Sequence, residues 1–386
     1  MGSTIFTDLA EELNECGHNV SVVAADSGIL TKSELALERG LRVLRVRSDD
    51  YYNVGYIKKG FAALTLPGKL KKAIMRNLRG ADIDLVLFES PPPTLSGVVA
   101  WAMDFFDCSS FLMLKDIFPQ NGVDIGLYGS KSLVYRYFRS REKALYNVAS
   151  RIGCMSEANK DYVINHNPDL DKSKVLVFPN TKKIGQTKSK VETYRLREKF
   201  SVPANSVVFL FGGNMGKPQA MDFLVDAIIS LRNEANVFFA LVGRGSEKKR
   251  IAEKLNGNRC GNYLMLDNMM RDVYEEFVRE CDVGLILLDH RFTIPNYPSR
   301  ILTYMEYSMP VIAATDPVTD LPKMVAEAGC GLCCLSDDLN GFISNIRKLA
   351  SDSRLREQMG VNGREYVAEH FEVMESVRIL QSMYRQ

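Results

Sequence analysis

One short segment of the sequence combines residues that suit the binding of a phosphate group. Gly213, Asn214, Gly216 and Lys217 follow an uninterrupted apolar run at residues 207–211. Such a run is typical of a buried parallel strand, and glycines let the backbone come close to a ligand. Apolar residues at helical spacing come next, at Met221, Leu224, Val225 and Ile228. The segment predicts a strand, a glycine-rich turn and a helix whose N-terminus can hold a phosphate.

Further polar residues follow other predicted strands in the second half of the chain. Arg244 comes after the strand at 237–242, and Ser299 and Arg300 come after the strand at 283–288. The carboxyl ends of parallel strands meet at one edge of a sheet, where open α/β sheets bind ligands. Arginine holds phosphate groups in a bidentate manner. Each of these residues alone would be interpreted as a surface side chain. Together with the glycine turn, they predict a site for a nucleotide diphosphate.

One carboxylate in the first half of the chain occupies a comparable position. Asp116 follows the predicted strand at 110–114, so it should face a cleft. Of the four histidines, only His290 lies near a strand end, and we interpret it as a surface residue. The sequence has neither a Walker lysine–serine pair nor a Gly-x-Ser-x-Gly turn, which argues against ATP hydrolysis and against a serine nucleophile.

Two groups of residues resemble metal ligands without completing a metal site. Asp82 and Asp84 form a carboxylate pair, but they precede a strand, so we interpret them as loop residues. Cys330, Cys333 and Cys334 are not followed by a second Cys or His pair, as a zinc site would require. We therefore expect no metal ion and no other resident cofactor.

Composition and element pattern indicate a globular α/β protein of two domains. The chain has 386 residues, of which 25% are charged, and a net charge of +2, which disfavours a nucleic-acid partner. Alternating strands and helices predict two doubly wound, Rossmann-like domains facing a cleft, at residues 1–185 and 186–386, with a linker at 182–191. The sequence shows no signal peptide and no apolar run of spanning length, which favours the cytoplasm.

The start of the chain departs from the Rossmann pattern. Residues 5–17 predict a helix and residues 19–25 predict a strand. A Rossmann-like domain begins instead with a strand and a glycine-rich turn. We expect that the first strand of the N-terminal domain is missing, either because the sequence starts late or because the domain lacks it.

Two basic stretches are interleaved with apolar and aromatic residues. Residues 51–80 contain seven lysines and arginines and no acid, and residues 131–141 combine basic with aromatic side chains. A basic amphipathic stretch can lie on an anionic membrane surface. The alternative is a helix packed on its domain with a solvated lysine face. The second stretch favours the membrane interpretation and a peripheral location on the inner face of the cell membrane.

Several segments together resemble a known enzyme family. They are FLFGGNMGKPQAMDFLVDAI, FALVGRGSEKKRI, ECDVGLILL, NYPSRILTYMEYSMPVIAATD and, in the first half, LKDIFPQNGVDIGLYG. The chain resembles the retaining glycosyltransferases of family 4, which have the GT-B fold. The similarity is greatest to bacterial surface-polysaccharide enzymes, including relatives of the N-acetyl-L-fucosamine and colanic acid transferases.

The resemblance implies transfer of a sugar, with retention and without a metal, from a nucleotide-sugar that is usually UDP-linked. The acceptor would be a saccharide or a polyprenyl-diphosphate-linked saccharide of O-antigen or capsule synthesis. Asp116 would serve the acceptor as a base or an orienting carboxylate, and Arg300 would take the role of a lysine common at the phosphates. The residues implied in donor binding are Gly213, Asn214, Gly216, Lys217, Arg244, Ser299, Arg300, Thr303 and Glu306.

The sequence also departs from the family pattern. Pro295 and Thr303 occupy the places of two glutamates that many members carry, and Asn214 and Gln219 replace an arginine and a lysine of the glycine turn. Glu306, one helical turn after Thr303, either supplies a ribose carboxylate or is a surface residue. These departures leave two alternatives to a transferase: a GT-B nucleotide-binding protein without turnover, or a nucleotide-sugar 2-epimerase.

Overall fold

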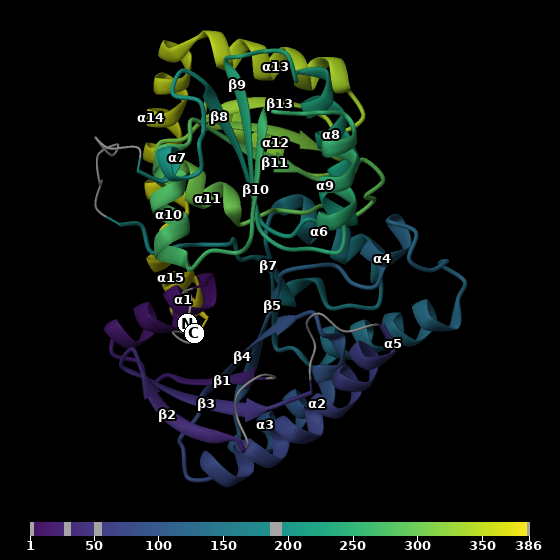
Figure 1. Ribbon diagram of the computed structural model, residues 1–386. Coiled ribbons are helices and arrows are strands. Elements are labelled where there is room, and N and C mark those ends of the chain that lie inside the picture. The colour runs from purple at the N-terminus through teal and green to yellow at the C-terminus, as the bar shows by residue number, and fades with distance from the viewer. Residues whose placement is uncertain (1–3, 27–31, 50–55, 186–194, 384–386) are drawn as a thin grey trace. The chain divides into compact units, whose positions relative to one another are not determined.

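The computed structural model describes residues 4–26, 32–49, 56–185 and 195–383 (Figure 1). The chain forms two compact units, which we describe separately. The N-terminal unit comprises Phe6–Pro179 and Ser376–Gln386, and the C-terminal unit comprises Asn180–Glu375 and Met1–Ile5. The division between the two lies a few residues before the domain boundary expected from the sequence. The end of the chain groups with the N-terminal unit instead of the second domain.

The C-terminal unit contains one six-stranded parallel sheet with the order β10-β9-β8-β11-β12-β13. Its strands are β8 (Val207–Gly212), β9 (Val237–Val242), β10 (Tyr263–Leu266), β11 (Val283–Leu287), β12 (Val311–Thr315) and β13 (Gly331–Leu335). The strand order reverses between β8 and β11. That position is a topological switch point, where ligands of open α/β sheets bind.

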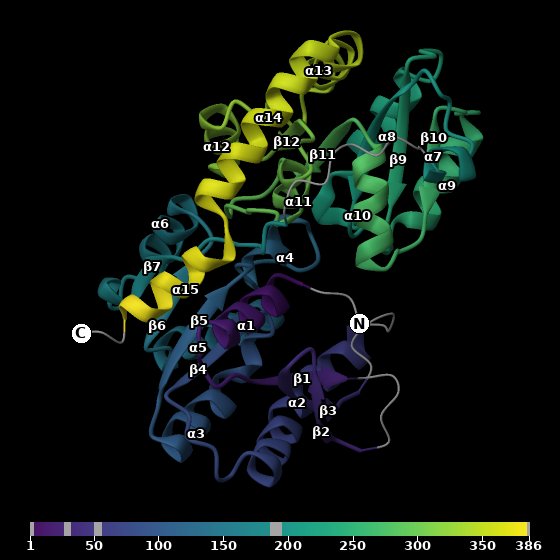
Figure 2. The same ribbon diagram turned by 90° about the vertical axis from the view of Figure 1, so that its left-hand side faces the viewer.

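The strands predicted from apolar runs in this unit are confirmed. Every residue of β8, β9, β11 and β12 is buried, as expected for strands of a parallel sheet covered by helices. One apolar cluster packs α8, α9 and α13 against the sheet, and Figure 2 shows α8 and α9 beside β9. The helices are α7 (Arg195–Lys199), α8 (Met221–Ser230), α9 (Lys248–Gly257), α10 (Arg271–Glu280), α11 (Arg300–Glu306), α12 (Leu321–Glu327), α13 (Leu339–Ser351) and α14 (Ser353–His370).

The N-terminal unit has its strands in two sheets. The first, in the order β1-β3-β2, contains β1 (Ser21–Asp26), β2 (Glu34–Glu38) and β3 (Leu41–Arg47). The second is parallel, in the order β4-β5-β6-β7, and contains β4 (Leu85–Ser90), β5 (Ser109–Leu114), β6 (Arg151–Cys154) and β7 (Val175–Val177). Within the described ranges, no strand pairs with both β1 and β4, so the two sheets are separate. Residues 1–3, which precede the predicted first helix, lie outside those ranges.

The antiparallel strand β2 is the one strand of this unit that the sequence did not predict. Most of its residues are exposed, as is usual for an edge strand, so it lacks a strong apolar pattern. It pairs antiparallel with β3 along its whole length, and Arg45 of β3 also donates to Glu38 over 2.8 and 2.6 Å. A strand with most of its side chains exposed lacks the apolar pattern from which a strand is predicted.

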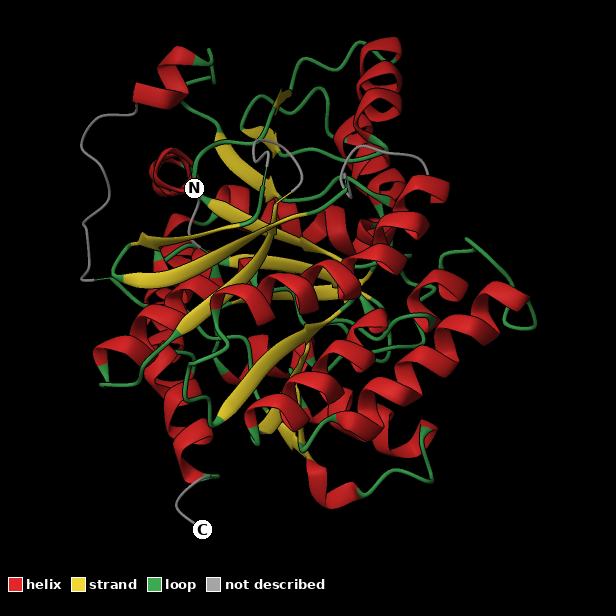
Figure 3. Ribbon diagram, turned by 90° about the horizontal axis from the view of Figure 1, so that it is seen from below, coloured by secondary structure: helices red, strands yellow, loops and turns green. Residues whose placement is uncertain are grey.

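Helices pack against the strands of the N-terminal unit, as the secondary-structure colouring of Figure 3 shows for the whole chain. Leu44 and Val46 of β3 form a buried cluster with Ala73 of α2. The helices are α1 (Ile5–Glu15), α2 (Tyr56–Asn77), α3 (Ser96–Phe106), α4 (Gln120–Asp124), α5 (Leu133–Val148) and α6 (Glu157–His166). Helix α15 (Val373–Ser382) belongs to this unit from Ser376 on. The predicted α/β class with two Rossmann-like domains is confirmed.

The packing of β6 gives a stability test. A Cβ at Gly153 would lie 2.5 Å from Phe178 Cβ and 2.7 Å from the Phe111 ring. We expect Gly153→Ala to destabilise the protein by about 1–3 kcal/mol, because a packed core resists an added carbon. Gly97→Ala in α3 is the control, since its Cβ would meet no atom within 4 Å. Urea unfolding followed by circular dichroism makes the comparison; equal midpoints for the two variants would contradict this account of the core.

Candidate functional site

The glycine turn after β8 packs backbone to backbone against the turn after β9. Gly213 N–H donates to Val242 O over 2.9 Å, and Met215 N–H donates to Arg244 O over 2.7 Å. Gly243 has a φ of 148°, and a Cβ there would lie 1.9 Å from Gly213 O. The two turns therefore form one rigid backbone platform at the carboxyl ends of β8 and β9. Glycine is required there partly by this mutual packing, which the sequence did not reveal.

The first residue of α11 places a cation against this platform. A Cβ at Gly213 would lie 3.2 Å from Nη1 of Arg300, and the Arg300 guanidinium stands 5.0 Å from the centre of the Phe211 ring. Nη1 is buried and has no hydrogen-bond partner among the described residues. Burial lowers the pKa of Arg300 from its ordinary value. A buried guanidinium without a carboxylate partner is costly unless an anion binds it.

Two tyrosines, Tyr304 of α11 and Tyr274 of α10, pack against the end of strand β8. The hydroxyl of Tyr304 accepts a hydrogen bond from Gly212 N–H over 3.0 Å and donates to Leu210 O over 3.3 Å. A Cβ at Gly212 would lie 1.8 Å from the hydroxyl of Tyr274, so the strand end is also closed against α10. These contacts hold the start of α11, and with it Arg300, beside the glycine turn.

The remaining residues of the predicted donor site surround this position to different degrees. The side chains of Asn214, Lys217, Arg244 and Ser299 are exposed. The loops after β8 and β11 meet, because Asp289 N–H donates to Pro218 O over 3.0 Å. The structure thus brings Gly213, the Arg244 turn and Arg300 together. Lys217, the first residue of a short 3-10 helix, and Ser299, just before α11, are exposed beside them.

Thr303 and Glu306 belong to a different cluster, centred on the buried Lys182. Lys182 Nζ lies 3.0 Å from Glu275 Oε1 and 3.3 Å from Thr303 Oγ1, and it forms an ion pair with Glu306. Glu306 Oε1 also accepts from Gly185 N–H over 3.0 Å. The interpretation of Glu306 as a surface residue is wrong, because the residue is buried. Its carboxylate is engaged within the unit, which leaves the ribose role without support.

The sequence places Lys182 in a predicted linker and gives no sign that its side chain is buried. The residue is only 4% exposed, and its backbone pairs with the segment before α15. Lys182 N–H donates to Phe371 O over 3.0 Å, and Val373 N–H donates to Lys182 O over 3.1 Å. The start of the predicted linker is therefore packed structure; the rest, from residue 186 on, lies outside the described residues. A lysine in a polar stretch gives no sequence signal for such burial.

Asp116 lies at the carboxyl end of β5, as predicted. Asn121 Nδ2 donates to Asp116 Oδ2 over 2.7 Å. Burial raises the pKa of the Asp116 carboxyl to about 6, although hydrogen bonds from Asn121 and from the Ile117 backbone oppose the shift. Beside it, burial lowers the pKa of Lys115 to about 8 against the opposing charge of Glu89. A carboxyl that titrates near neutral pH can act as a general base.

The remaining residues considered in the sequence are the carboxylate pair, His290 and the cysteines. Asp82 and Asp84 are exposed loop residues, as predicted. The His290 side chain is 50% exposed, in agreement with its interpretation as a surface residue. All eight cysteines are free. Within the described part of the chain, no group of three or more His, Cys, Asp or Glu side chains is arranged to hold a metal ion.

Comparison with protein families divides the chain in the same way as the fold. Residues 2–181 match the family described as "Glycosyl transferase 4-like domain", and residues 206–352 match "Glycosyl transferases group 1". Each half of the chain is thus similar to a glycosyltransferase family domain. With two Rossmann-like units and a site at the switch point of the second, the architecture is that of the GT-B glycosyltransferases.

Two curated relatives connect the chain to surface polysaccharides by name. It is 22% identical over 233 residues to "Probable glycosyltransferase WbjE" of Pseudomonas aeruginosa, over 59% of this chain and 56% of that protein. It is 22% identical over 177 residues to "Putative colanic acid biosynthesis glycosyl transferase WcaI" of Escherichia coli K12, over 45% of this chain and 43% of that protein. The matches span about half the length of these relatives.

Solved structures with the same fold cover nearly the whole chain. Sucrose-phosphate synthase from Thermosynechococcus elongatus has a TM-score of 0.77 at 16% identity and covers 99% of this chain and 92% of its own. HepE from Anabaena, solved with UDP and glucose, has a TM-score of 0.68 at 16% identity and covers 90% and 87%. In the described ranges, none of the helices has the length and apolar character to cross a membrane.

The pKa of Asp116 predicts a pH-dependent gain of stability on substitution. The folded protein binds the Asp116 proton more tightly than the unfolded chain, whose aspartates titrate near 3.9. Stability from this group is therefore present below about pH 4 and is lost as the pH rises through about 6. We expect Asp116→Asn to stabilise the protein at pH 8 by about 2–3 kcal/mol and to have no such effect at pH 4.

Thermal melting at the two pH values measures this difference. Asp82→Asn, at an exposed loop position, is the matched control. An Asp116→Asn protein that melts below the wild type at pH 8 would show that the ionised carboxylate is structurally required, against this account.

Proposed function

We propose that the chain is a retaining, metal-independent glycosyltransferase. It takes a sugar from a UDP-linked donor and places it on a saccharide or a polyprenyl-diphosphate-linked acceptor during bacterial surface-polysaccharide synthesis, of O-antigen or capsule type. The observation that carries the proposal is the half-buried Arg300 guanidinium, whose buried Nη1 atom has no hydrogen-bond partner among the described residues and lies against the glycine turn. The UDP in the HepE structure and the names of WbjE and WcaI support the donor and the pathway class.

The chemistry of a diphosphate fits this site. A diphosphate offers several anionic oxygens, which can accept from a guanidinium and from backbone amides at the same time. Exposed Lys217 and Arg244 stand on the two turns next to Arg300 and supply further positive charge. No protein carboxylate competes for the Arg300 Nη1 atom among the described residues.

In the transfer, the bond between the anomeric carbon and the leaving diphosphate breaks as the acceptor oxygen bonds to that carbon on the same face. Arg300 and the turn amides stabilise the charge that grows on the leaving diphosphate. The acceptor proton passes to the leaving phosphate, or to Asp116 if that carboxylate acts as base. This front-face route requires no protein nucleophile, and it needs no metal because protein cations neutralise the diphosphate.

One observation favours a second candidate, a nucleotide-binding protein without turnover. The positions of the family's glutamate pair hold Pro295 and Thr303, and Glu306 is bound to Lys182. A chain of this kind would bind the nucleotide through Arg300 but would transfer no sugar. Turnover assays with UDP-sugars separate the two candidates once nucleotide binding is established.

Nucleotide calorimetry tests the proposed site. We expect UDP to bind the wild type in preference to GDP and ADP, and Arg300→Ala to weaken UDP binding about tenfold to a hundredfold, because a hydrogen bond to a charged group contributes about 1.5–3 kcal/mol. Arg300→Lys should keep more of the affinity, since it retains a cation. Arg347→Ala, at an exposed arginine paired with Glu234, is the control. Absence of binding by all three nucleotides would overturn the proposal.

We also propose that the protein is cytoplasmic and associates with an anionic membrane surface through the two basic stretches. In α2, Lys72 and Arg76 are exposed beside Met75, whose exposed fraction is 42%. At the start of α5, Leu133 is 79% and Val134 48% exposed, in a stretch that also carries Arg136. Apolar residues open to solvent among cations are typical of a membrane-surface contact.

Vesicle flotation tests the membrane contact. We expect binding to vesicles that contain phosphatidylglycerol, and about hundredfold weaker binding when Lys71, Lys72 and Arg76 are changed to Gln, since each contributes about 1 kcal/mol near an anionic surface. The control changes three exposed cations of the C-terminal unit, Lys249, Lys323 and Arg347. Equal flotation of both triple variants would rule out α2 as the contact.

A further inference from the structure

A cavity of about 210 Å³ lies within the N-terminal unit, beside the loop that carries Asp116. The loop contributes Ile117 and Gln120 to its wall, while most of the other lining residues come from α5 and α6. Asn121, which donates to Asp116, is the residue after Gln120. The cavity and the candidate acceptor-side carboxylate are therefore shaped by the same short loop. The mechanism described above does not use this cavity.

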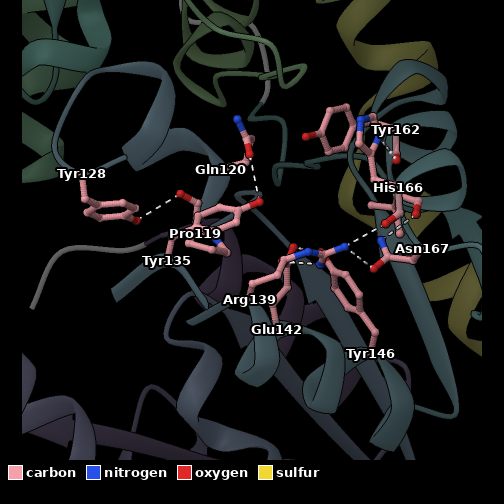
Figure 4. A network of polar contacts seen from close by, with 11 residues as sticks. Pro119, Gln120, Tyr128, Tyr135, Arg139, Glu142, Tyr146, Tyr162, His166 and Asn167 are labelled. Carbon is pink, nitrogen blue, oxygen red and sulfur yellow. Dashed lines mark hydrogen bonds and ion pairs between the residues drawn. The ribbon is translucent and has the colours of Figure 1, made fainter. Parts of the chain in front are cut away.

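The floor of the cavity is a polar network whose charges balance (Figure 4). Arg139 Nη1 lies 2.5 Å from Glu142 Oε2, and Arg139 Nη2 donates to Asn167 Oδ1 over 2.7 Å and to His166 O over 2.8 Å. Glu142 Oε1 accepts from Tyr146 over 2.7 Å. One cation and one anion thus neutralise each other, so the cavity has no net charge from these groups to attract a charged ligand.

Aromatic side chains supply the other walls. Tyr162 stacks on His166 with ring centres 3.8 Å apart and an angle of 15° between the planes. Tyr135 donates to Gln120 Oε1 over 3.2 Å. The Tyr162 hydroxyl has no hydrogen-bond partner among the described residues, and in Figure 4 it points to the side where Gln120 lies. The cavity therefore offers aromatic surface and an available hydroxyl next to fixed amide and guanidinium groups.

The volume, charge balance and aromatic walls of the cavity restrict the kind of ligand that it can bind. At about 210 Å³ the space is smaller than the roughly 300–1,000 Å³ of pockets for drug-sized ligands, so it suits one small ring. A balanced Arg–Glu pair disfavours an anion or a cation. Aromatic walls with several hydrogen-bonding groups favour a ring that carries hydroxyls over a purely apolar one. A neutral sugar ring meets all three conditions.

We propose that this cavity between α5 and α6 is a subsite for a neutral sugar ring of the acceptor, at a position other than the reacting sugar. The inference rests on the proposed function for the presence of a saccharide acceptor. A hydroxyl of the bound sugar ring would donate to the Glu142–Tyr146 pair, and another would hydrogen-bond with the Tyr162 hydroxyl. In this way the subsite would select acceptors of more than one sugar unit.

Ligand-observed NMR titration tests the subsite with defined probes: the methyl glycosides of glucose, galactose and N-acetylglucosamine, with glucuronic acid as the charged comparison. We expect at least one neutral glycoside to bind, and Tyr162→Phe to weaken it about threefold to tenfold, because the variant removes one hydroxyl and keeps the stacked ring. Tyr263→Phe is the matched control, since its hydroxyl bonds to Asn256 in the C-terminal unit. His166→Ala, which removes the ring on which Tyr162 stacks, is a second variant of the same wall and should also weaken glycoside binding.

The outcomes separate this subsite from the proposed function. Unchanged affinity in both Tyr162→Phe and His166→Ala, preference for glucuronic acid, or no binding of any glycoside would overturn the subsite. Nucleotide calorimetry on the wild type tests the donor site independently. Glycoside binding lost in Tyr162→Phe, in a protein that binds no nucleotide, would support the subsite and count against the transferase.

Discussion

The candidate site depends on one half-buried cation, Arg300, that packing holds in place. Arg300 lies against Gly213 and over the Phe211 ring, and its Nη1 atom has no partner among the described residues. Burying a charge in this way costs free energy. The guanidinium stays in this position despite the cost because the Tyr304 hydroxyl bonds α11 to both Leu210 and Gly212 of β8. The rest of the sheet therefore determines where the guanidinium lies, and an anion is what would complete its environment.

Two other cations, the buried Lys182 and the half-buried Arg139, have carboxylate partners within the protein. Lys182 is surrounded by Glu275, Glu306 and Thr303, and Arg139 is neutralised by Glu142. Removing either partner of such a pair would leave an uncompensated charge, which makes these clusters part of the framework. The compensated Arg139 cluster can line a neutral cavity, whereas the uncompensated Arg300 suits a diphosphate.

The N-terminal unit places its chemistry at the ends of β4 and β5. Glu89, Lys115 and Asp116 lie there, and burial moves the pKa of each toward neutral pH. Such shifts arise from desolvation, so they could not be assigned before the packing was known. Sequence position alone identified Asp116 as a residue at a strand end. The cavity beside it combines residues from 117 to 167, which no single motif contains.

The sequence by itself determined the alternating strands and helices, the two-domain α/β class and the glycine turn after β8. Apolar runs such as 207–211 report burial directly, because a covered parallel strand has no solvent face. Tertiary structure alone decided that Lys182 is buried, that Glu306 is ion-paired, and that β2 pairs as an edge strand. It also decided that Arg300 has no partner within the described chain. The reason is physical: a polar side chain acquires its role from neighbours distant in sequence, and local patterns carry no record of them.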